Sequence, residues 1–157
     1  MENFAKLQKE SEKHNLFLLK DSFSRDEVSS LMNVCDAYVS LHRSEGFGLT
    51  IAESMMLGKP VIATNYSGNI DFLNEENGFP IPYTLIPLEK DYGPYKKGNV
   101  WASPNEEKAA EAMRMIYNHQ EIAGRKGGRA RNDIVTKLSS VAVAEAITHR
   151  LAHIKLK

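Results

Sequence analysis

The sequence predicts an α/β fold in which a parallel sheet is flanked by helices. Short apolar runs at residues 16–20, 37–42 and 60–64 lack polar alternation, which is typical of strands buried on both faces. The segments between them have helical spacing, and strands that alternate with helices favour a parallel, Rossmann-like sheet. With 157 residues and 42% hydrophobic side chains, the chain can bury one ordinary core, so we expect a single domain over residues 1–157.

The helix that follows the first apolar run has a clear start signal. Ser24 and Glu27 form a capping box, and the apolar positions that follow have helical spacing: Val28, Leu31, Met32 and Cys35. We expect this helix to face the sheet and Cys35 to be a core residue rather than a nucleophile. Because Cys35 is the only cysteine, an internal disulfide and a cysteine zinc cluster are excluded.

The second helix is predicted over residues 48–57, and Gly58 followed by Pro60 marks its end. Residues 79–88 contain three prolines, which favours an edge strand or an extended segment. Residues 89–102 are polar and contain glycine and proline, so we expect a loop there.

The C-terminal third is predicted to be helical. Ser103, Pro104 and Glu106 supply an N-cap, a first-turn proline and a capping box for a helix that ends near Asn118. Two further helical patterns follow, at residues 120–136 and 139–155.

The charge balance excludes some classes of partner. Twenty basic and twenty acidic side chains cancel, so no global field attracts nucleic acid or an anionic membrane. A local basic cluster, formed by Arg125, Lys126, Arg129 and Arg131, favours a solvated helix face over nucleic-acid binding because no aromatic residues interleave with it. No apolar run approaches the roughly 20 residues of a membrane span, and the N-terminus lacks a signal-peptide core, so we expect a cytoplasmic protein.

The stretch "HRSEGFGLTIAES" at residues 42–54 lies where a predicted strand turns into a helix. In open α/β sheets, ligands bind at the carboxyl ends of the strands. Gly46 and Gly48 let the backbone approach a ligand closely, and the amides of Phe47, Gly48 and Leu49 fall at a helix N-terminus, which favours an anion. The sequence therefore predicts a phosphate site at this turn.

Two glutamates bracket the predicted phosphate site. Like charges repel, so Glu45 and Glu53 cannot bind the phosphate and are instead expected to accept hydrogen bonds from hydroxyl groups on either side of it. The ligand would therefore carry hydroxyls, then phosphates, then hydroxyls. A nucleotide-diphosphate sugar has its groups in that order. Spacing alone still favours a plainer alternative: a solvated loop glutamate, an exposed helix glutamate and glycines that only make the turn. The dinucleotide fingerprint is absent because Ile51 stands where its third glycine would be, and no Walker loop is present.

For the other residues that could form a site, the sequence favours ordinary structural roles. No Asp-x-Asp pair occurs, so metal-assisted diphosphate departure is not predicted, and cations and dipoles are the expected substitute. His149 and His153 have the spacing of a helical metal pair but no third ligand, so we expect exposed histidines and no metal site or cofactor. Trp101, Tyr92 and Tyr95 could line a sugar pocket, although aromatic residues in such a loop more often anchor it.

The stretch "SLHRSEGFGLTIAESMMLGKPVIATNYSGNIDFL" resembles the signature of the family 4 glycosyltransferases, retaining enzymes of the GT-B fold whose donor domain contains Glu, seven residues, Glu. In this sequence the pair is Glu45 and Glu53. The stretches "SGNIDFLNEENGFPIPY" and "WASPNEEKAAEAM" resemble the polysaccharide and O-antigen branch of that family.

The resemblance implies a role for each residue of the turn. Glu45 is the expected catalytic residue near the donor sugar, residues 46–49 bind the diphosphate, and Glu53 holds the ribose. The expected donor-binding residues are Gly46, Phe47, Gly48, Leu49, Thr50, Glu53, Arg43 and His42. For His42 two possibilities stay open: burial beside the strand end, or an orientation toward the donor.

The resemblance extends from about Asp21 to the C-terminus. It implies the donor half of a two-domain enzyme, without the first strand-helix units, their cationic loops and the N-terminal acceptor domain. The expected function is retaining, metal-independent transfer of a sugar from a nucleotide-diphosphate sugar to a glycan or lipid-linked acceptor, with the isolated chain inactive alone. The alternative is a non-catalytic module that binds a nucleotide weakly or pairs with another chain. We expect the N-terminal helix, the final helix at residues 139–155 or a second copy of the chain to cover the unpaired sheet edge. The expected partners are that second copy or the missing N-terminal domain.

Overall fold

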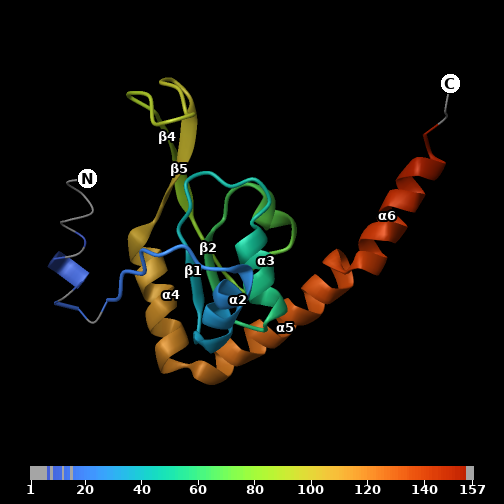
Figure 1. The fold of residues 1–157 in the computed structure, drawn as a ribbon, viewed down its shortest axis with the longest axis horizontal. Coiled ribbons are helices and arrows are strands. Elements are labelled where there is room, and N and C mark those ends of the chain that lie inside the picture. The colour runs from blue at the N-terminus through green and yellow to red at the C-terminus, as the bar shows by residue number, and fades with distance from the viewer. Residues whose placement is uncertain (1–6, 8, 12, 15, 155–157) are drawn as a thin grey trace. The chain divides into compact units, whose positions relative to one another are not determined.

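The computed structural model describes residues 7, 9–11, 13–14 and 16–154, so most of the helical pattern before residue 16 lies outside the described residues. By internal contacts the chain forms two compact units, Met1–Ser30 and Leu31–Lys157, which we describe separately. Helices and strands carry the labels of Figure 1.

The first unit contains the apolar run at residues 16–20, which forms no strand. Its large side chains are exposed, with Phe17 at 87%. The predicted strand is therefore wrong for this structure. A strand is held by hydrogen bonds to a neighbour, and none of the strands in the described part of the chain pairs with this segment.

Helix α2, Arg25–Val34, starts at the predicted capping box, which is confirmed. The Ser24 amide donates to Glu27 Oε2 at 2.7 Å, and the Glu27 amide donates to Ser24 Oγ at 3.3 Å. However, no residue of α2 is buried and Cys35 is exposed, so the predicted core role of Cys35 is wrong. Apolar spacing selected the helix correctly but did not supply a surface to cover its apolar face.

The second unit is built on a parallel sheet, which confirms the predicted fold class. Strands β1 (Tyr38–Ser40), β2 (Val61–Thr64) and β3 (Phe79–Ile81) lie in that order, with all neighbours parallel. Strand β2 is central and fully buried, as its apolar run predicted.

Helices cover both faces of this sheet (Figure 1). On one face Val61 and Ala63 pack against α3 (Leu49–Met56) and α5 (Gln120–Leu138). On the other face Ile62 packs against α4 (Glu106–Asn118) and the start of α5. Alternate residues of one strand thus serve two cores, as the period of two in a strand requires.

A two-stranded antiparallel hairpin extends the fold beyond β3. It consists of β4, Tyr83–Pro87, and β5, Val100–Pro104. The segment predicted over 79–88 therefore splits into β3 and β4, and the predicted loop 89–102 is shorter because its end pairs with β4. The predicted N-cap at Ser103 is wrong, since Ser103 and Pro104 pair with β4 and the N-cap of α4 is Asn105, whose side chain accepts from the Lys108 amide at 2.9 Å.

Helix α6, Ser140–Ala152, follows α5 and confirms the last predicted helical pattern, whose residue 155 lies outside the described residues. None of its residues is buried. Among the described residues, no helix has the length and apolar character that a bilayer crossing demands.

Candidate functional site

The turn between β1 and α3 carries the candidate site, at the carboxyl end of a parallel strand as predicted. Gly48 caps α3 in the left-handed conformation, with φ 89°. A side chain there would also meet Asn69 Cβ at 3.2 Å and Ile51 Cδ1 at 3.3 Å. The positive φ therefore favours glycine at position 48, and the tight contacts add to that preference.

The loop after β2 supports this turn from within the protein. Ser67 Oγ donates to the carbonyl oxygen of Glu45, and a Cβ at Gly68 would overlap the Gly46 carbonyl oxygen. The ring of Phe47 lies 5.4 Å from that of Phe72, which is buried. Two strand ends that are neighbours in the sheet thus fix the shape of the turn.

Glu45 occupies the amides of its own turn. Its Oε1 accepts from the Gly46 amide at 3.0 Å and from the Gly48 amide at 3.2 Å. Within the described part of the chain, the amides of Phe47 and Leu49 donate no hydrogen bond. The turn therefore holds one anionic oxygen already and presents further donors at a helix N-terminus, where the dipole favours negative charge.

Two other predicted residues lie on α3 itself. Thr50 Oγ1 accepts from the Tyr38 hydroxyl at 2.8 Å, which ties the first turn of the helix to β1. Glu53 lies one turn further along and is half-buried, with an interaction of its own. Helical geometry thus places Glu45 before and Glu53 after the start of α3, as the sequence predicted.

His42 links the two strand ends. Its Nε2 lies 2.9 Å from the Tyr66 carbonyl oxygen, and its Nδ1 lies 3.3 Å from Ser40 Oγ. A carbonyl oxygen can only accept, so Nε2 carries a proton and donates it to this oxygen, and in the neutral ring Nδ1 accepts from the serine hydroxyl. Of the two possibilities left open by the sequence, these contacts match the half-buried ring beside the strand end.

Arg43 is joined to the β4–β5 hairpin, a contact that the sequence did not predict. Its carbonyl oxygen accepts from the Ala102 amide at 2.9 Å, and its Cζ lies 5.2 Å from the centre of the Trp101 ring. Nearly sixty residues separate the two segments, so no local pattern carried this information. The tryptophan in "WASP" was the one feature of the sequence that could have pointed to a contact with a cation.

The basic cluster on α5 stabilises a loop. Lys126 Nζ donates to the carbonyl oxygens of Glu75 and Gly78, and Arg129 pairs with Glu76 at 2.9 Å. Burial lowers the pKa of Lys126, and the negative charges of Glu75 and Glu76 partly oppose that shift. These two cations thus have partners within the protein.

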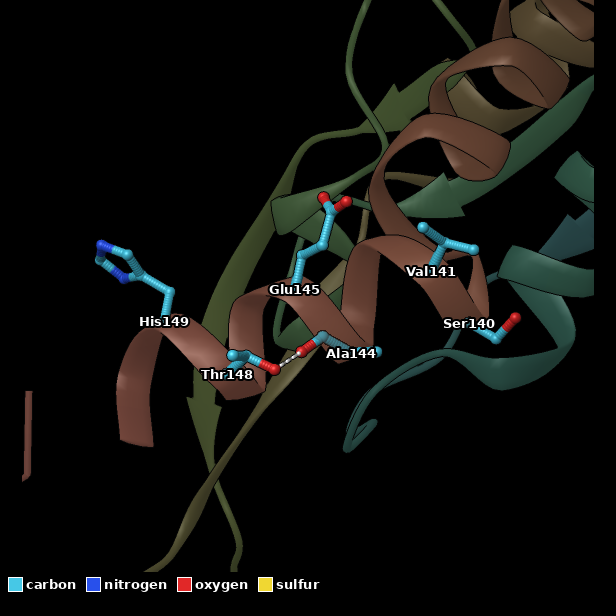
Figure 2. Close-up of a pocket in the computed structure, with 6 residues that line it drawn as sticks. All are labelled: Ser140, Val141, Ala144, Glu145, Thr148 and His149. Carbon is cyan, nitrogen blue, oxygen red and sulfur yellow. Dashed lines mark hydrogen bonds between the residues drawn. The ribbon is translucent and has the colours of Figure 1, made fainter. Parts of the chain in front are cut away.

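The histidines of α6 contact each other, with ring centres 4.4 Å apart, and His153 Nδ1 lies 2.7 Å from the His149 carbonyl oxygen. A hollow of about 590 Å³ on this helix is lined by six residues, all on α6 (Figure 2): Ser140, Val141, Ala144, Glu145, Thr148 and His149. Because all six residues lie on one helix, the hollow is bounded on one side only. In the part of the chain that the structure describes, no three His, Cys, Asp or Glu side chains are grouped closely enough to hold a metal ion.

Comparisons with known proteins agree on one class. An uncharacterized glycosyltransferase of Methanocaldococcus jannaschii is 44% identical over 68 residues, which are 43% of this chain and 18% of that protein. The O-antigen biosynthesis glycosyltransferase WclY of Escherichia coli is 52% identical over 40 residues, 26% of this chain and 11% of WclY. The chain thus spans less than a fifth of the length of these relatives.

Among solved structures, Anabaena HepE in complex with UDP-glucose shares the fold with a TM-score of 0.65 at 20% identity. The match covers 96% of this chain and 37% of HepE. The family model described as glycosyl transferases group 1 matches residues 1–133, which include the whole Glu45–Glu53 site. The chain therefore belongs to the group 1 glycosyltransferase family.

Proposed function

We propose that this chain supplies the donor-binding site of a glycosyltransferase that uses a nucleotide-diphosphate sugar and a glycan or lipid-linked acceptor. One observation carries the proposal: the Gly46 and Gly48 amides at the start of α3 hold a carboxylate oxygen. An oxygen of a diphosphate has the same charge and the same need for donors, so the turn is suited to receive it.

The two glutamates lie on either side of the proposed diphosphate site, as the ribose and the sugar do on either side of the diphosphate in such a donor. Glu53, one turn inside α3, accepts hydrogen bonds from the ribose hydroxyls, and Glu45 acts beside the sugar. The UDP-glucose complex of HepE and the O-antigen role of WclY support a nucleotide sugar and a polysaccharide acceptor for this chain. Retention of configuration and independence from metal belong to the same proposal.

Glu45 would have one position without the donor and another with the donor bound. Without donor its carboxylate caps the turn, and the incoming diphosphate competes with it for the Gly46 and Gly48 amides. A displaced Glu45 would then be available beside the sugar. Donor binding and the placement of the catalytic carboxylate are thereby coupled, because the two anions repel each other at the same amides.

Calorimetric titration of the chain with UDP, GDP, ADP and inorganic pyrophosphate tests the site. We expect one nucleotide to bind best and pyrophosphate to compete with it. Replacing Glu53 with alanine should lower nucleotide affinity about tenfold, since it removes a charged hydrogen bond, while pyrophosphate binding is unchanged. Equal losses for nucleotide and pyrophosphate would contradict the ribose role.

A second variant tests the competition at the amides. Glu45→Gln removes the charge that opposes the diphosphate, so pyrophosphate should bind several-fold more tightly while sugar transfer by a complete enzyme falls. Glu89→Gln is the matched control, because Glu89 is exposed in the hairpin loop and lies outside the turn. Weaker pyrophosphate binding by Glu45→Gln would mean that the carboxylate supports the anion site instead of competing for it.

One observation favours the non-catalytic alternative, a chain-pairing module. Strand β1 ends the sheet, and within the described residues its outer edge pairs with no strand. Val39 on this strand is 41% exposed. Unpaired edges are templates for association, so light scattering should detect a dimer that Val39→Lys disrupts. A monomer at all concentrations would exclude self-pairing through β1.

A further inference from the structure

Arg43 is fixed at its main chain by the β4–β5 hairpin. The Ala102 amide of β5 donates to the Arg43 carbonyl oxygen at 2.9 Å, and Ala102 is fully buried. Arg43 itself follows β1 and lies two residues before Glu45. The hairpin therefore meets the sheet at the start of the candidate donor turn.

The Arg43 side chain lies over an indole that other rings support. Its Cζ is 5.2 Å from the centre of the Trp101 ring, while Tyr92 lies 5.1 Å and Tyr95 6.4 Å from the same ring. Tyr92 and Tyr95 exchange two backbone hydrogen bonds, of 2.8 and 3.1 Å. Trp101 is therefore held by the hairpin loop, and its contact with Arg43 is part of one packed aromatic group.

The guanidinium has no anionic partner in the described part of the chain. Arg43 is exposed and makes no ion pair there, while the basic residues Lys126 and Arg129 have partners. An arginine side chain has large rotamer entropy, and its planar group binds a phosphate best when its direction is fixed beforehand. The cation–π contact with Trp101 restricts that freedom without using any of the guanidinium donors.

We propose that Trp101 is a positioning residue, which holds the Arg43 guanidinium ready for the diphosphate of the nucleotide donor. The inference rests on the proposed function and deepens it, because it makes the β4–β5 hairpin a determinant of donor affinity. Arg43 lies three residues from Gly46, which limits the separation of their Cα atoms to about 11 Å. At that separation the guanidinium and the turn amides can bind the same diphosphate.

The test is a double-mutant cycle on the full chain, with inorganic pyrophosphate and UDP as the titrated probes. Arg43→Ala should lower pyrophosphate affinity about tenfold, the value of one charged hydrogen bond. Trp101→Leu should lower it about threefold, because the arginine stays but loses its cation–π contact. In the Arg43→Ala background, Trp101→Leu should have no further effect. With Arg43 present, Trp101→Phe should lose less affinity than Trp101→Leu, because a phenyl ring still offers the guanidinium an aromatic face.

A structural role for Trp101 would give a different pattern. Leu85→Ala is the matched control, because Leu85 lies opposite Ala102 in the hairpin and is 53% exposed. It should leave pyrophosphate affinity unchanged. If Trp101→Leu lowers affinity equally with and without Arg43, or if Leu85→Ala lowers it as much, the positioning role is overturned.

The outcomes separate this inference from the proposed function. A wild-type chain that binds pyrophosphate and UDP, with an Arg43→Ala variant that binds both equally well, would overturn the role of Arg43 and Trp101 and leave the donor site standing. A wild-type chain that binds neither probe would overturn both proposals. Backbone NMR spectra of each variant establish that the fold is intact before affinities are compared.

Discussion

Residues 16–19 and strand β2 are both short, largely apolar segments, but only β2 is buried. Leu16, Phe17, Leu18 and Leu19 are exposed by 38% or more, whereas all four residues of β2 are fully buried. The difference lies in the neighbours, because β2 has β1 on one side and β3 on the other, with helices over both faces. An apolar run therefore becomes a buried strand only when other segments complete its hydrogen bonds and cover it.

Hydrogen exchange gives the largest expected contrast between the two regions. The amides of Phe17, Leu18 and Leu19 donate no hydrogen bond among the described residues, whereas β2 lies in a ladder on both sides. We expect exchange in β2 to be slower by a factor of about 10³ or more, as for a core strand. Slow exchange at residues 17–19 would show that these amides are hydrogen-bonded in solution, and protection that grows with protein concentration would show that a second copy completes the strand.

Truncation of one large side chain in each region is the next test. Ile62 of β2 is fully buried against α4, so Ile62→Ala should lower the free energy of unfolding by about 2–5 kcal/mol. Leu16 is 59% exposed, so Leu16→Ala should change it by about 0.5 kcal/mol or less. Urea unfolding measures both values. A large loss at Leu16 would mean that the exposed segment is packed in solution.

The tight packing of the sheet continues into the candidate site, and substitutions at Gly68 and Gly46 test where in the turn it restricts the chain. A Cβ at Gly68 would overlap the Gly46 carbonyl oxygen, so Gly68→Ala should destabilise the protein by about 1–3 kcal/mol and weaken pyrophosphate binding. Gly46→Ala is the control, because a Cβ there meets no atom within 4 Å. Equal effects on stability would show that the packing of the turn against the Ser67 loop is not what restricts Gly68.

Local signals in the sequence predicted most of the second unit. The apolar run of β2, the glycine that caps α3 and the helical spacing of α5 each depend on residues within a few positions, and all three elements formed. The errors have nonlocal causes. Ser103 is a good N-cap by type, but pairing with Thr84 drew it into β5, so α4 begins after Asn105.

In the candidate site, too, the local features were predictable from the sequence and the nonlocal ones were not. The spacing of Glu45 and Glu53 around a helix start was predictable, because helix geometry converts sequence distance into position. The capture of the Gly46 and Gly48 amides by Glu45 itself was not predicted, and neither was the contact between Arg43 and Trp101. The first depends on a side-chain conformation, and the second joins segments that only the folded hairpin brings together.

The smallest expected effect concerns the capping box of α2, which forms next to the segment that fails to become a strand. The pKa of Glu27 is lowered because its carboxylate accepts hydrogen bonds from the Ser24 amide and then the Ser24 hydroxyl. A carboxylate with a depressed folded pKa adds stability above the ordinary glutamate pKa of about 4.3 and loses it as the pH falls through the folded value.

Carbon chemical shifts of the first turn of α2 should therefore report reduced helicity below that pH, while the shifts at residues 16–19 stay constant. Glu27→Gln is the control, since a neutral amide oxygen still accepts from the Ser24 amide but does not titrate. A pH dependence that persists in this variant would assign the transition to another group. If residues 16–19 shifted together with α2, the two would behave as one cooperative element, and the segment would not be independent of the helix that follows it.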